Sequence, residues 1–302
     1  MRGHKAALLK KEIPFYIMLI PGIIVVFIYG YIPLGGIVMA FQNFMPALGV
    51  FKSPWVGWDN FEYALSMPDT MQVLYNTLFI ALMKIAAGLV TPIAVSLMLN
   101  EVKQRGVKRV IQTIIYLPHF LSWVILSGVL IDILSPSEGI VGQIFQLFSM
   151  KPVFFLGDEN WFPYTMVISD VWKEFGFGTV IYLAALTSID PELYEAALMD
   201  GASRWKRTLH VTLPGIMPIV VLMTVLALGN VLNAGFDQIY NMISAQVYST
   251  GDIIDTMVYR MGLRQVQYSV ATAVGLFKSV ISFTLISISY YLAYKLVDYR
   301  IF

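Results

Sequence analysis

The sequence predicts an all-α integral membrane protein, and three observations lead to this fold class. Of its 302 residues, 58% are hydrophobic and 13% are charged, whereas soluble chains are about half apolar and about a quarter charged. Six long apolar runs each reach the roughly 20 residues that a membrane-spanning helix needs. No stretch alternates between apolar and polar residues over about ten positions, as the strands of a membrane barrel do. We therefore expect six transmembrane helices.

The six apolar runs follow one another along the chain, separated by more polar loops. They cover residues 13–40, 73–99, 110–134, 162–187, 215–236 and 270–297. The N-terminus is basic and then apolar, as in a signal peptide. No small-residue cleavage site follows the short apolar stretch that such a peptide has. We therefore expect the first run to be retained as a membrane anchor.

Basic residues are distributed unequally between the loops, and this bias predicts the orientation of a membrane protein. One set of loops and both chain ends carry Arg2, Lys5, Lys10, Lys11, Lys103, Arg105, Lys108, Arg109, Arg204, Lys206, Arg207, Lys295 and Arg300. The loops on the other side carry Lys52, Lys151, Arg260 and Arg264. Both termini are therefore predicted to lie in the cytoplasm.

Several classes of function are not favoured by the composition. The net charge of +1 gives no overall field that would attract nucleic acid. The absence of cysteine excludes disulfides and thiolate metal sites. Neither the phosphate-binding motif G-x-x-x-x-G-K-[ST] nor the nucleophile motif G-x-S-x-G occurs. We expect no catalytic residue, no metal site and no cofactor bound by this chain.

The loop between the fourth and fifth runs, residues 188–214, is polar and helix-prone. Asp190 is a good N-cap, and Pro191 occupies the preferred first helical position. Gly201 offers a helix stop, and Ser203 can cap a second short helix. From physics alone, the loop is either an amphipathic hairpin at the lipid headgroups or a helix that docks in a partner protein.

A patch of small residues in this loop slightly favours docking, because small side chains permit close backbone approach. Its members are Ala196, Ala197, Gly201 and Ala202.

The same loop resembles the EAA loop of permease subunits in bacterial ABC importers, in the stretch EAALMDGASRWKRTLHVTLP. The family pattern is Glu-Ala-Ala, three residues, Gly, nine residues, an aliphatic residue, one residue and Leu-Pro. It is filled here by Glu195, Ala196, Ala197, Gly201, Val211, Leu213 and Pro214. Valine replaces the more usual isoleucine, which is a mild departure.

Other segments resemble the carbohydrate-uptake branch of this family, which is maltose-type and has a MetI-like fold. They include PFYIMLIPGIIVVFIYGYIPLGGIVMAF, WVGWDNFEYAL and RVIQTIIYLPHFLSWVI, and they look closest to LplB-type polysaccharide and oligosaccharide permeases. The resemblance implies a type I ABC importer transmembrane domain in the bacterial cytoplasmic (inner) membrane. Residues 1–302 would form one permease domain. Residues 1–69 would hold the tail, first helix and outer loop, and 70–297 the five-helix core with the coupling loop.

The resemblance also implies a function and a set of partners. The chain would be the permease of an ATP-driven importer of oligosaccharides or polysaccharide-derived sugars. Two cytoplasmic ATPase subunits would bind ATP and magnesium, so the chain itself would not be an enzyme. A second, homologous permease subunit and an extracytoplasmic sugar-binding protein would complete the complex in membrane lipid, without nucleic acid. The residues expected to couple to the ATPases are Glu195, Ala196, Ala197, Asp200, Gly201, Arg204, Leu213 and Pro214.

The alternative is a secondary transporter or channel that runs on an ion gradient. Such a protein would need no docking hairpin, and purification with or without ATPase subunits would distinguish the two. An intramembrane enzyme is a third class, but it would need a catalytic constellation that the sequence does not contain.

Charged residues interrupt the fourth run at positions that share one helical face, Asp170, Lys173 and Glu174. Charges at this depth usually face a bundle interior or a water-filled cavity. They are either a structural ion cluster or a sugar site, in which carboxylates bind hydroxyls and Trp172 stacks on a sugar ring.

A second polar stripe, Asn230, Asn233 and Asp237, is predicted on the fifth span. It is either hydrogen-bonding glue between helices or a continuation of the sugar site. Resemblance to maltose-type permeases implies sugar contacts on the helices just before and after the EAA loop. The predicted substrate-binding residues are therefore Asp170, Trp172, Lys173, Glu174, Asn230, Asn233 and Asp237.

The apolar runs also contain two lysines, Lys84 and Lys278, and one histidine, His119. Lys84 and Lys278 are expected to snorkel or to pair with a carboxylate. A less favoured hypothesis has them bind, with Lys173, an acidic sugar. His119 is expected to pack between helices, because the other histidines, His4 and His210, are predicted on the cytoplasmic side.

Overall fold

The structure is a computed structural model that describes the backbone of residues 2–297. Helices and loops make up this part of the chain, and an isolated bridge between Gln42 and Trp55 is the β-type pairing within it. The predicted all-α class is therefore confirmed. Arg300 and the predicted cytoplasmic C-terminal end lie outside the described residues.

The chain divides into two compact units. The first unit comprises Met1–Ser66 and Arg260–Leu276, and the second comprises Met67–Tyr259 and Phe277–Phe302. The predicted division of the permease at residues 69 and 70 stays a prediction.

The first unit contains a long N-terminal helical segment and several short helices. Its elements are α1 (Arg2–Val26), η1 (Phe27–Tyr31), η2 (Ile32–Phe41), α2 (Gly49–Lys52), α3 (Asp59–Ser66), η6 (Arg260–Arg264) and the start of α15 (Tyr268–Val297). The Phe41 ring stacks on Trp55 with 5.6 Å between centroids and meets Trp58 edge-on at 5.4 Å. Asn60 donates from Nδ2 to the carbonyls of Ala40 and Gln42. These contacts fix the loop that follows the first predicted span.

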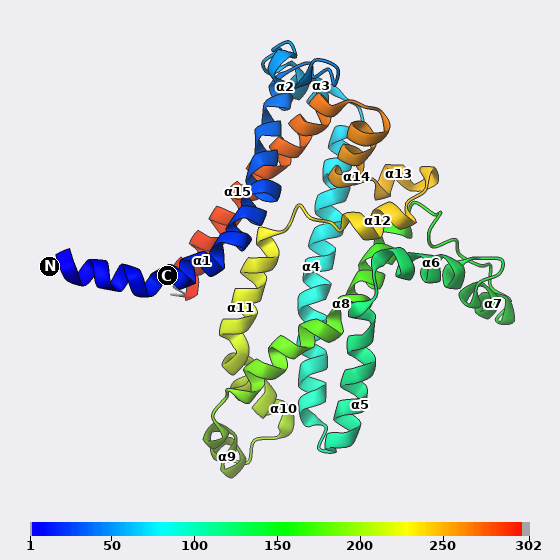
Figure 1. The fold of residues 1–302 in the computed structure, drawn as a ribbon. Coiled ribbons are helices and arrows are strands. Elements are labelled where there is room, and N and C mark those ends of the chain that lie inside the picture. The colour runs from blue at the N-terminus through cyan, green and yellow to red at the C-terminus, as the bar shows by residue number, and fades with distance from the viewer. Residues whose placement is uncertain (1, 298–302) are drawn as a thin grey trace. The chain divides into compact units, whose positions relative to one another are not determined.

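The second unit contains the remaining helices, which Figure 1 shows from cyan to red. They are α4 (Thr70–Glu101), α5 (Arg105–Tyr116), η3 (Leu117–Phe120), α6 (Trp123–Leu134), α7 (Ile140–Leu147), α8 (Phe162–Thr187), α9 (Pro191–Met199), α10 (Arg204–Arg207), η4 (Thr208–Thr212), α11 (Leu213–Gly229), α12 (Phe236–Met242), η5 (Ala245–Val247), α13 (Tyr248–Gly251), α14 (Ile254–Tyr259) and most of α15. Helices α4 and α8 pack against one another over much of their length.

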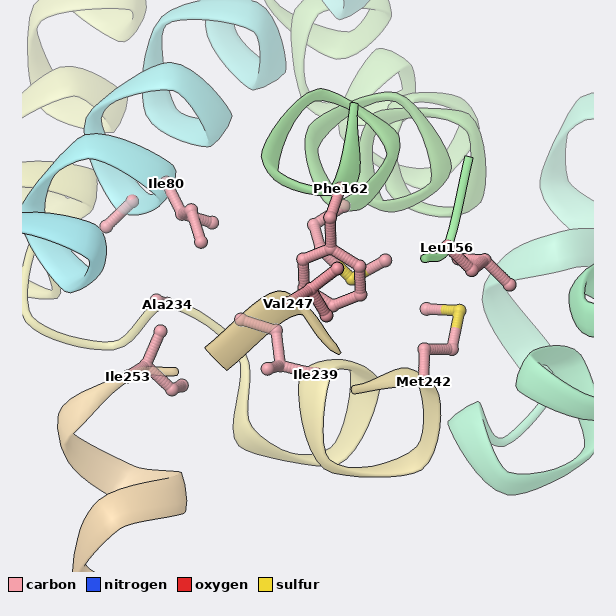
Figure 2. Packing of buried hydrophobic residues seen from close by; sticks show 10 residues of the cluster. Ile80, Leu156, Phe162, Ala234, Ile239, Met242, Val247 and Ile253 are labelled. Carbon is pink, nitrogen blue, oxygen red and sulfur yellow. The ribbon is translucent and has the colours of Figure 1, made fainter. Parts of the chain in front are cut away.

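One buried apolar cluster joins α4, α8, α12 and the loops near them (Figure 2). Phe162, Met166 and Ile239 are fully buried in it. A second cluster contains Tyr182, Ile189 and Ile216, and it joins α8 and α11 near the α9–α10 hairpin. The two clusters hold opposite ends of α8.

Four helical stretches are long and apolar enough to cross a membrane: Ile13–Phe41, Thr70–Glu101, Arg204–Gly229 and Tyr268–Tyr291. A fifth is reached only if α5–η3 and α6 are counted as one span, because these bend by 104° at a break. The apolar run predicted over 110–134 is therefore divided between two helices, and its role as one span stays a prediction. Ser122 begins α6 as an N-cap, and its hydroxyl accepts from the Ile125 N–H; this local cap competes with continuation of the helix.

The fourth and fifth predicted spans also differ from simple apolar helices. Helix α8 has the predicted bounds, 162–187, but Asp170, Lys173 and Glu174 keep it outside the apolar stretches described above. Helix α11 ends at Gly229, although the prediction extended it to residue 236. The count of six transmembrane helices and the cytoplasmic position of both termini stay predictions.

The close approach of α5 to α8 generates a test of this packing. A methyl group on Gly176 would lie 1.9 Å from the Ile115 carbonyl oxygen, so Gly176→Ala should force the helices apart. We expect a loss of about 1–3 kcal/mol of stability, measured as a lower unfolding temperature of the purified protein. Gly128→Ala on α6 is the control, because open space surrounds that position. Equal unfolding temperatures for the two variants would contradict this packing.

Candidate functional site

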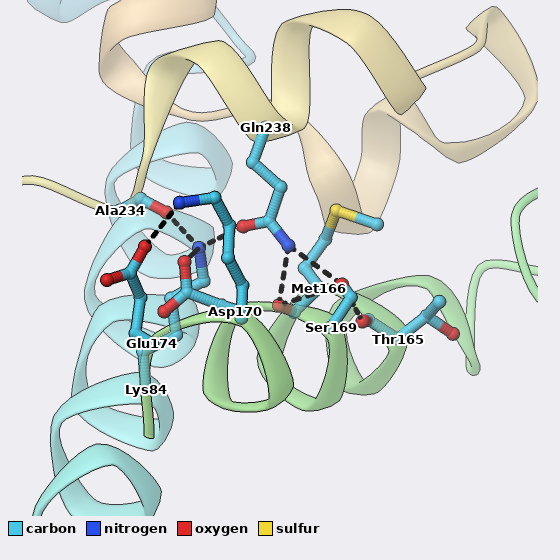
Figure 3. A network of polar contacts seen from close by, with 9 residues as sticks. Lys84, Thr165, Met166, Ser169, Asp170, Glu174, Ala234 and Gln238 are labelled. Carbon is cyan, nitrogen blue, oxygen red and sulfur yellow. Dashed lines mark hydrogen bonds and ion pairs between the residues drawn. The ribbon is translucent and has the colours of Figure 1, made fainter. Parts of the chain in front are cut away.

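A buried ammonium group connects three parts of the second unit (Figure 3). Lys84 on α4 is 9% exposed, and its Nζ donates to Asp170 Oδ1 on α8 at 3.2 Å. It also donates to the Ala234 carbonyl at 2.7 Å and to Gln238 Oε1. An ammonium group has three N–H donors, so its hydrogen-bonding capacity is used. The predicted pairing of Lys84 with a carboxylate is confirmed.

Gln238 extends this network to the inner face of α8. Its side chain is fully buried, and its Nε2 donates to the Met166 carbonyl and to Ser169 Oγ, both at 2.8 Å. The Ser169 hydroxyl in turn donates to the Thr165 carbonyl at 2.6 Å. A buried amide is costly unless it is hydrogen-bonded, and here both its oxygen and its nitrogen have partners. Helix α12 is thereby fixed against α4 and α8.

A cavity of about 420 Å³ lies beside this network. Apolar residues of α4 and α11 form much of its wall, including Ile85, Leu89 and Leu226. Its polar groups are Lys84, Asp170, Asn230 and Asn233, from the residues that line it. A cavity that is largely apolar, with a few convergent polar groups, is the usual form of a small-molecule site.

Three of the seven predicted substrate-binding residues line this cavity: Asp170, Asn230 and Asn233. The four that do not are Trp172, Lys173, Glu174 and Asp237. Trp172 is 45% exposed. The roles of all seven in binding stay predictions.

The predicted stripe of Asn230, Asn233 and Asp237 along one helix is wrong. Helix α11 ends before Asn230, and Asp237 lies in the first turn of α12. Gly235 separates the two helices with φ of +94°, in the left-handed region that glycine adopts without steric cost. Two asparagines and a glycine within a few residues favour a helix end. Hydrophobicity alone does not locate it.

The other charged residues of α8 form a separate cluster at the α5–α6 bend. Lys173 Nζ lies 2.6 Å from Glu174 Oε1 and donates to the His119 carbonyl at 3.1 Å. His119 Nδ1 lies 2.7 Å from Glu174 Oε2, and its ring stacks on Phe177 at 4.2 Å. The expected packing role of His119 is confirmed. Since the Lys173 and Glu174 charges meet one another at the bend, this cluster supports the structural alternative for them.

Lys278 forms an ion pair of the same kind elsewhere in the second unit. Its Nζ donates to Asp255 Oδ1, and both side chains are about one-fifth exposed, at 19% and 24%. The predicted pairing of Lys278 with a carboxylate is confirmed. Gln238, in contrast, was missed by the sequence analysis. A glutamine just beyond a predicted span gives no signal that it is buried.

The α9–α10 hairpin has the geometry that the sequence predicts. Asp190 Oδ1 accepts from the Glu192 N–H at 2.9 Å, and Ser203 Oγ accepts from the Lys206 N–H at 3.4 Å. Gly201 has φ of +72° between the two helices. Six of the eight predicted coupling residues are exposed, namely Glu195, Ala196, Asp200, Gly201, Arg204 and Pro214, and the others, Ala197 and Leu213, are half-buried.

The hairpin is also tied to the rest of the second unit. The Tyr194 hydroxyl lies 3.1 Å from the Thr212 hydroxyl, which joins α9 to the segment after α10. Arg204 Nη1 lies 3.7 Å from Glu101 Oε2 at the end of α4; both groups are exposed, so this pair contributes little. From Arg204 the chain runs as one helical stretch of 26 residues to Gly229. The hairpin and the cavity therefore lie at the two ends of one helical stretch.

Comparisons with known proteins identify relatives along the whole chain. Residues 84–302 match the protein family described as binding-protein-dependent transport system inner membrane component. The chain is 41% identical to Protein LplB of Bacillus subtilis, over 96% of this chain and 91% of that protein. It is 39% identical to the polygalacturonan/rhamnogalacturonan transport system permease protein YteP of the same organism, over 93% and 87% of the two chains.

Solved structures give the same result for the fold. A bacterial ABC transporter involved in the import of the acidic polysaccharide alginate superposes with a TM-score of 0.90. The two chains are 36% identical, and the match covers 98% of this chain and 99% of the other. A structure of the alginate transporter in complex with an alginate pentasaccharide-bound periplasmic protein matches with a TM-score of 0.87 at 36% identity, over 95% and 96% of the chains.

The position of Asn230 generates a test of the cavity. The chain has no cysteine, so any thiol reaction of the chain comes from the single cysteine that is introduced. Asn230 is exposed at the cavity, whereas Ile216 on α11 is fully buried. We expect Asn230→Cys to react with a water-soluble maleimide in membranes, and Ile216→Cys to stay unmodified. The cavity assignment fails if the two thiols react at the same rate.

Proposed function

This chain belongs to the family of binding-protein-dependent transport system inner membrane components, and we propose that it is the permease subunit of an ABC importer for oligosaccharides. The observation that carries the proposal is the match to the alginate importer over nearly the whole of both chains. The expected MetI-like, type I importer fold and the resemblance to sugar permeases are confirmed. The chain is an inner-membrane transport component, and its match to a permease family is the reason to assign it no reaction of its own.

The proposed substrate is an oligosaccharide derived from a polysaccharide, as the names of YteP and the alginate transporter suggest. Within the cavity, the amides of Asn230 and Asn233 and the carboxylate of Asp170 supply donors and acceptors that suit sugar hydroxyls. The apolar wall suits the C–H faces of a sugar ring. The substrate-binding roles of Trp172, Lys173, Glu174 and Asp237 receive no such support.

Recognition of an acidic sugar by Lys84, Lys173 or Lys278 is not part of this proposal. Each of these ammonium groups already has a carboxylate partner, namely Asp170, Glu174 or Asp255. A sugar carboxylate would have to displace that partner from a partly buried position, which is costly for the charge left behind.

The proposed partners follow the division of labour in ABC importers. Two cytoplasmic ATPase subunits would bind ATP with magnesium and supply the free energy of transport. A second permease subunit, a homologue of this chain, would complete the membrane part, and an extracytoplasmic binding protein would deliver the sugar. The complex lies in membrane lipid. We further propose six spans with both termini in the cytoplasm, and one permease domain whose core is residues 70–297.

The α9–α10 hairpin is the proposed docking element for the ATPases. Exposed small residues, Ala196 and Gly201, leave room for close approach of a partner backbone. The caps at Asp190 and Ser203 stiffen the hairpin, so it can move as a rigid element when the ATPases close. The helical stretch from Arg204 to Gly229 would transmit this movement to the cavity, switching it between the two sides of the membrane.

An ion-gradient-driven secondary transporter or channel is the alternative. Its test is purification of the chain from membranes in mild detergent. Stoichiometric recovery of ATPase subunits with the chain supports the importer. If the Glu195→Lys chain loses these subunits and the Glu195→Gln chain keeps them, their contact lies on α9. Transport by the chain alone, driven by an ion gradient, would establish the alternative.

The left-handed conformation at Gly201 generates a prediction about coupling. At φ of +72° a valine is strained, and the strain should destabilise the hairpin by about 1–3 kcal/mol. Asparagine tolerates this conformation. We expect Gly201→Val to abolish ATP-dependent uptake while its amount in the membrane, measured by immunoblot, stays normal. Gly201→Asn is the size-matched control and should retain uptake. Normal uptake by Gly201→Val would refute the coupling role.

The cavity amides generate a second prediction. Asn233→Ala removes one hydrogen-bonding side chain, which contributes about 0.5–1.5 kcal/mol. We therefore expect about a three- to tenfold higher sugar concentration for half-maximal uptake by the reconstituted importer. Asn241→Ala is the control, since that amide donates to the Asp237 carbonyl within its own helix. An unchanged value for Asn233→Ala would remove Asn233 from the sugar site.

A further inference from the structure

We propose that Lys84 is a positioning residue for the cavity and that it holds one end of a hinge. The hinge is residues 230–235, between the end of α11 and the start of α12. Lys84 does not contact sugar in this proposal. Its ammonium fixes the far end of the hinge to α4 and α8, so that Asn230 and Asn233 line the same cavity as Asp170. This inference rests on the proposed function where it treats the cavity as a sugar site. The contacts of Lys84 do not depend on that function.

The first argument is the origin of the three acceptors. Asp170 lies on α8, Ala234 in the hinge and Gln238 on α12, and all three accept from one group on α4. Because the ammonium is a compact charge with three donors, the three elements cannot separate without leaving a buried charge or carbonyl unpaired. The contact is therefore a tie between elements, and it leaves Lys84 no N–H for a ligand.

The second argument is the construction of the hinge. Its apolar residues Val231 and Leu232 are buried at 7% and 2% exposure, but apolar contacts are non-directional. The backbone bonds of Asn230 and Asn233 are local, to the Ala227 and Asn230 carbonyls at 3.0 and 2.8 Å. The bond from Lys84 to the Ala234 carbonyl is a directional contact that joins this segment to α4.

The third argument is the space left at Gly235. A methyl group there would lie 2.8 Å from Lys84 Nζ, which is too close for a relaxed contact. The same residue has φ of +94°, which disfavours other residues. Glycine therefore serves both the turn into α12 and the approach of the ammonium to the backbone (Figure 3).

The consequence is a mechanical asymmetry. The end of the hinge at Asn230 continues α11 and the stretch that begins at Arg204, whereas the other end is fixed by Lys84. When α11 moves, the change of angle is confined to residues 230–235, and the cavity amides are displaced relative to Asp170. Without the tie, α12 stays held to α8 through Gln238, but the Ala234 end of the hinge loses its bond to α4. The cavity amides then lose their defined position relative to Asp170.

The experiment measures the mobility of the hinge directly. A nitroxide spin label is attached to Asn233→Cys in the otherwise cysteine-free chain, and the complete importer is reconstituted in nanodiscs without sugar. We expect Lys84→Met to narrow the lines in the electron paramagnetic resonance spectrum of the label, because the hinge becomes more mobile. Lys278→Met is the matched control: it removes another intramembrane lysine paired with an aspartate, and its spectrum should equal that of the unsubstituted importer.

Lys84→Met leaves the Asp170 carboxylate without its partner, and this unpaired charge can prevent the importer from assembling. A second variant therefore removes both charges. Lys84→Met/Asp170→Leu removes both charges and should assemble, yet the Ala234 carbonyl still lacks its donor, so the lines should stay narrow. In importers without the label, Lys84→Met should raise the sugar concentration for half-maximal uptake about tenfold, while Lys84→Arg retains part of the affinity.

The proposal is overturned if both Lys84 variants give the broad lines of the unsubstituted importer, or if Lys278→Met narrows them equally. The label reports the mobility of the hinge, and this measurement needs neither sugar nor transport. An importer that fails to take up oligosaccharide therefore refutes the proposed function, while the spectra still decide the role of Lys84.

Discussion

A charged amine in an apolar span needs partners, and the partners of Lys84 determine how the second unit is assembled. The ammonium is buried, at 9% exposure, so its donors must meet protein acceptors. They come from α8, from the segment after α11 and from α12. This requirement brings together elements that are far apart in the sequence. The cavity lies beside the point where they meet, and its polar lining includes both members of the ion pair.

The packing around this contact provides a rigid frame. Phe162, Met166 and Ile239 fill the space between α8 and α12, and Gln238 bonds to the α8 backbone across the same interface. At the other end of α8, Ile189 and Ile216 pack near the hairpin. The helical stretch from Arg204 to Gly229 begins at the hairpin and ends beside the cavity. It is therefore the covalent connection between the two.

Much of this fold could be predicted from the sequence, because long apolar runs and caps act locally. The bounds of α8, the Asp190 and Ser203 caps and the left-handed Gly201 are examples. The bend before α6 and the end of α11 at Gly229 could not be predicted from hydropathy, since apolar residues continue through both places. The partners within the charged face of α8 could not be predicted either: Asp170 pairs with Lys84 on another helix, whereas Lys173 pairs with its neighbour Glu174. Which charges pair depends on how the helices pack in three dimensions, and the spacing of residues along one helix does not reveal this.

The central claim is that this chain transports oligosaccharide only as the membrane part of an ATP-driven complex. The direct measurement is uptake of labelled oligosaccharide into proteoliposomes that contain the chain, its partner permease and the ATPases, with ATP inside or absent. We expect uptake that requires both ATP and the loaded binding protein, and that persists when ion gradients are collapsed. Uptake that continues without ATP and stops when an ion gradient is collapsed would contradict the account.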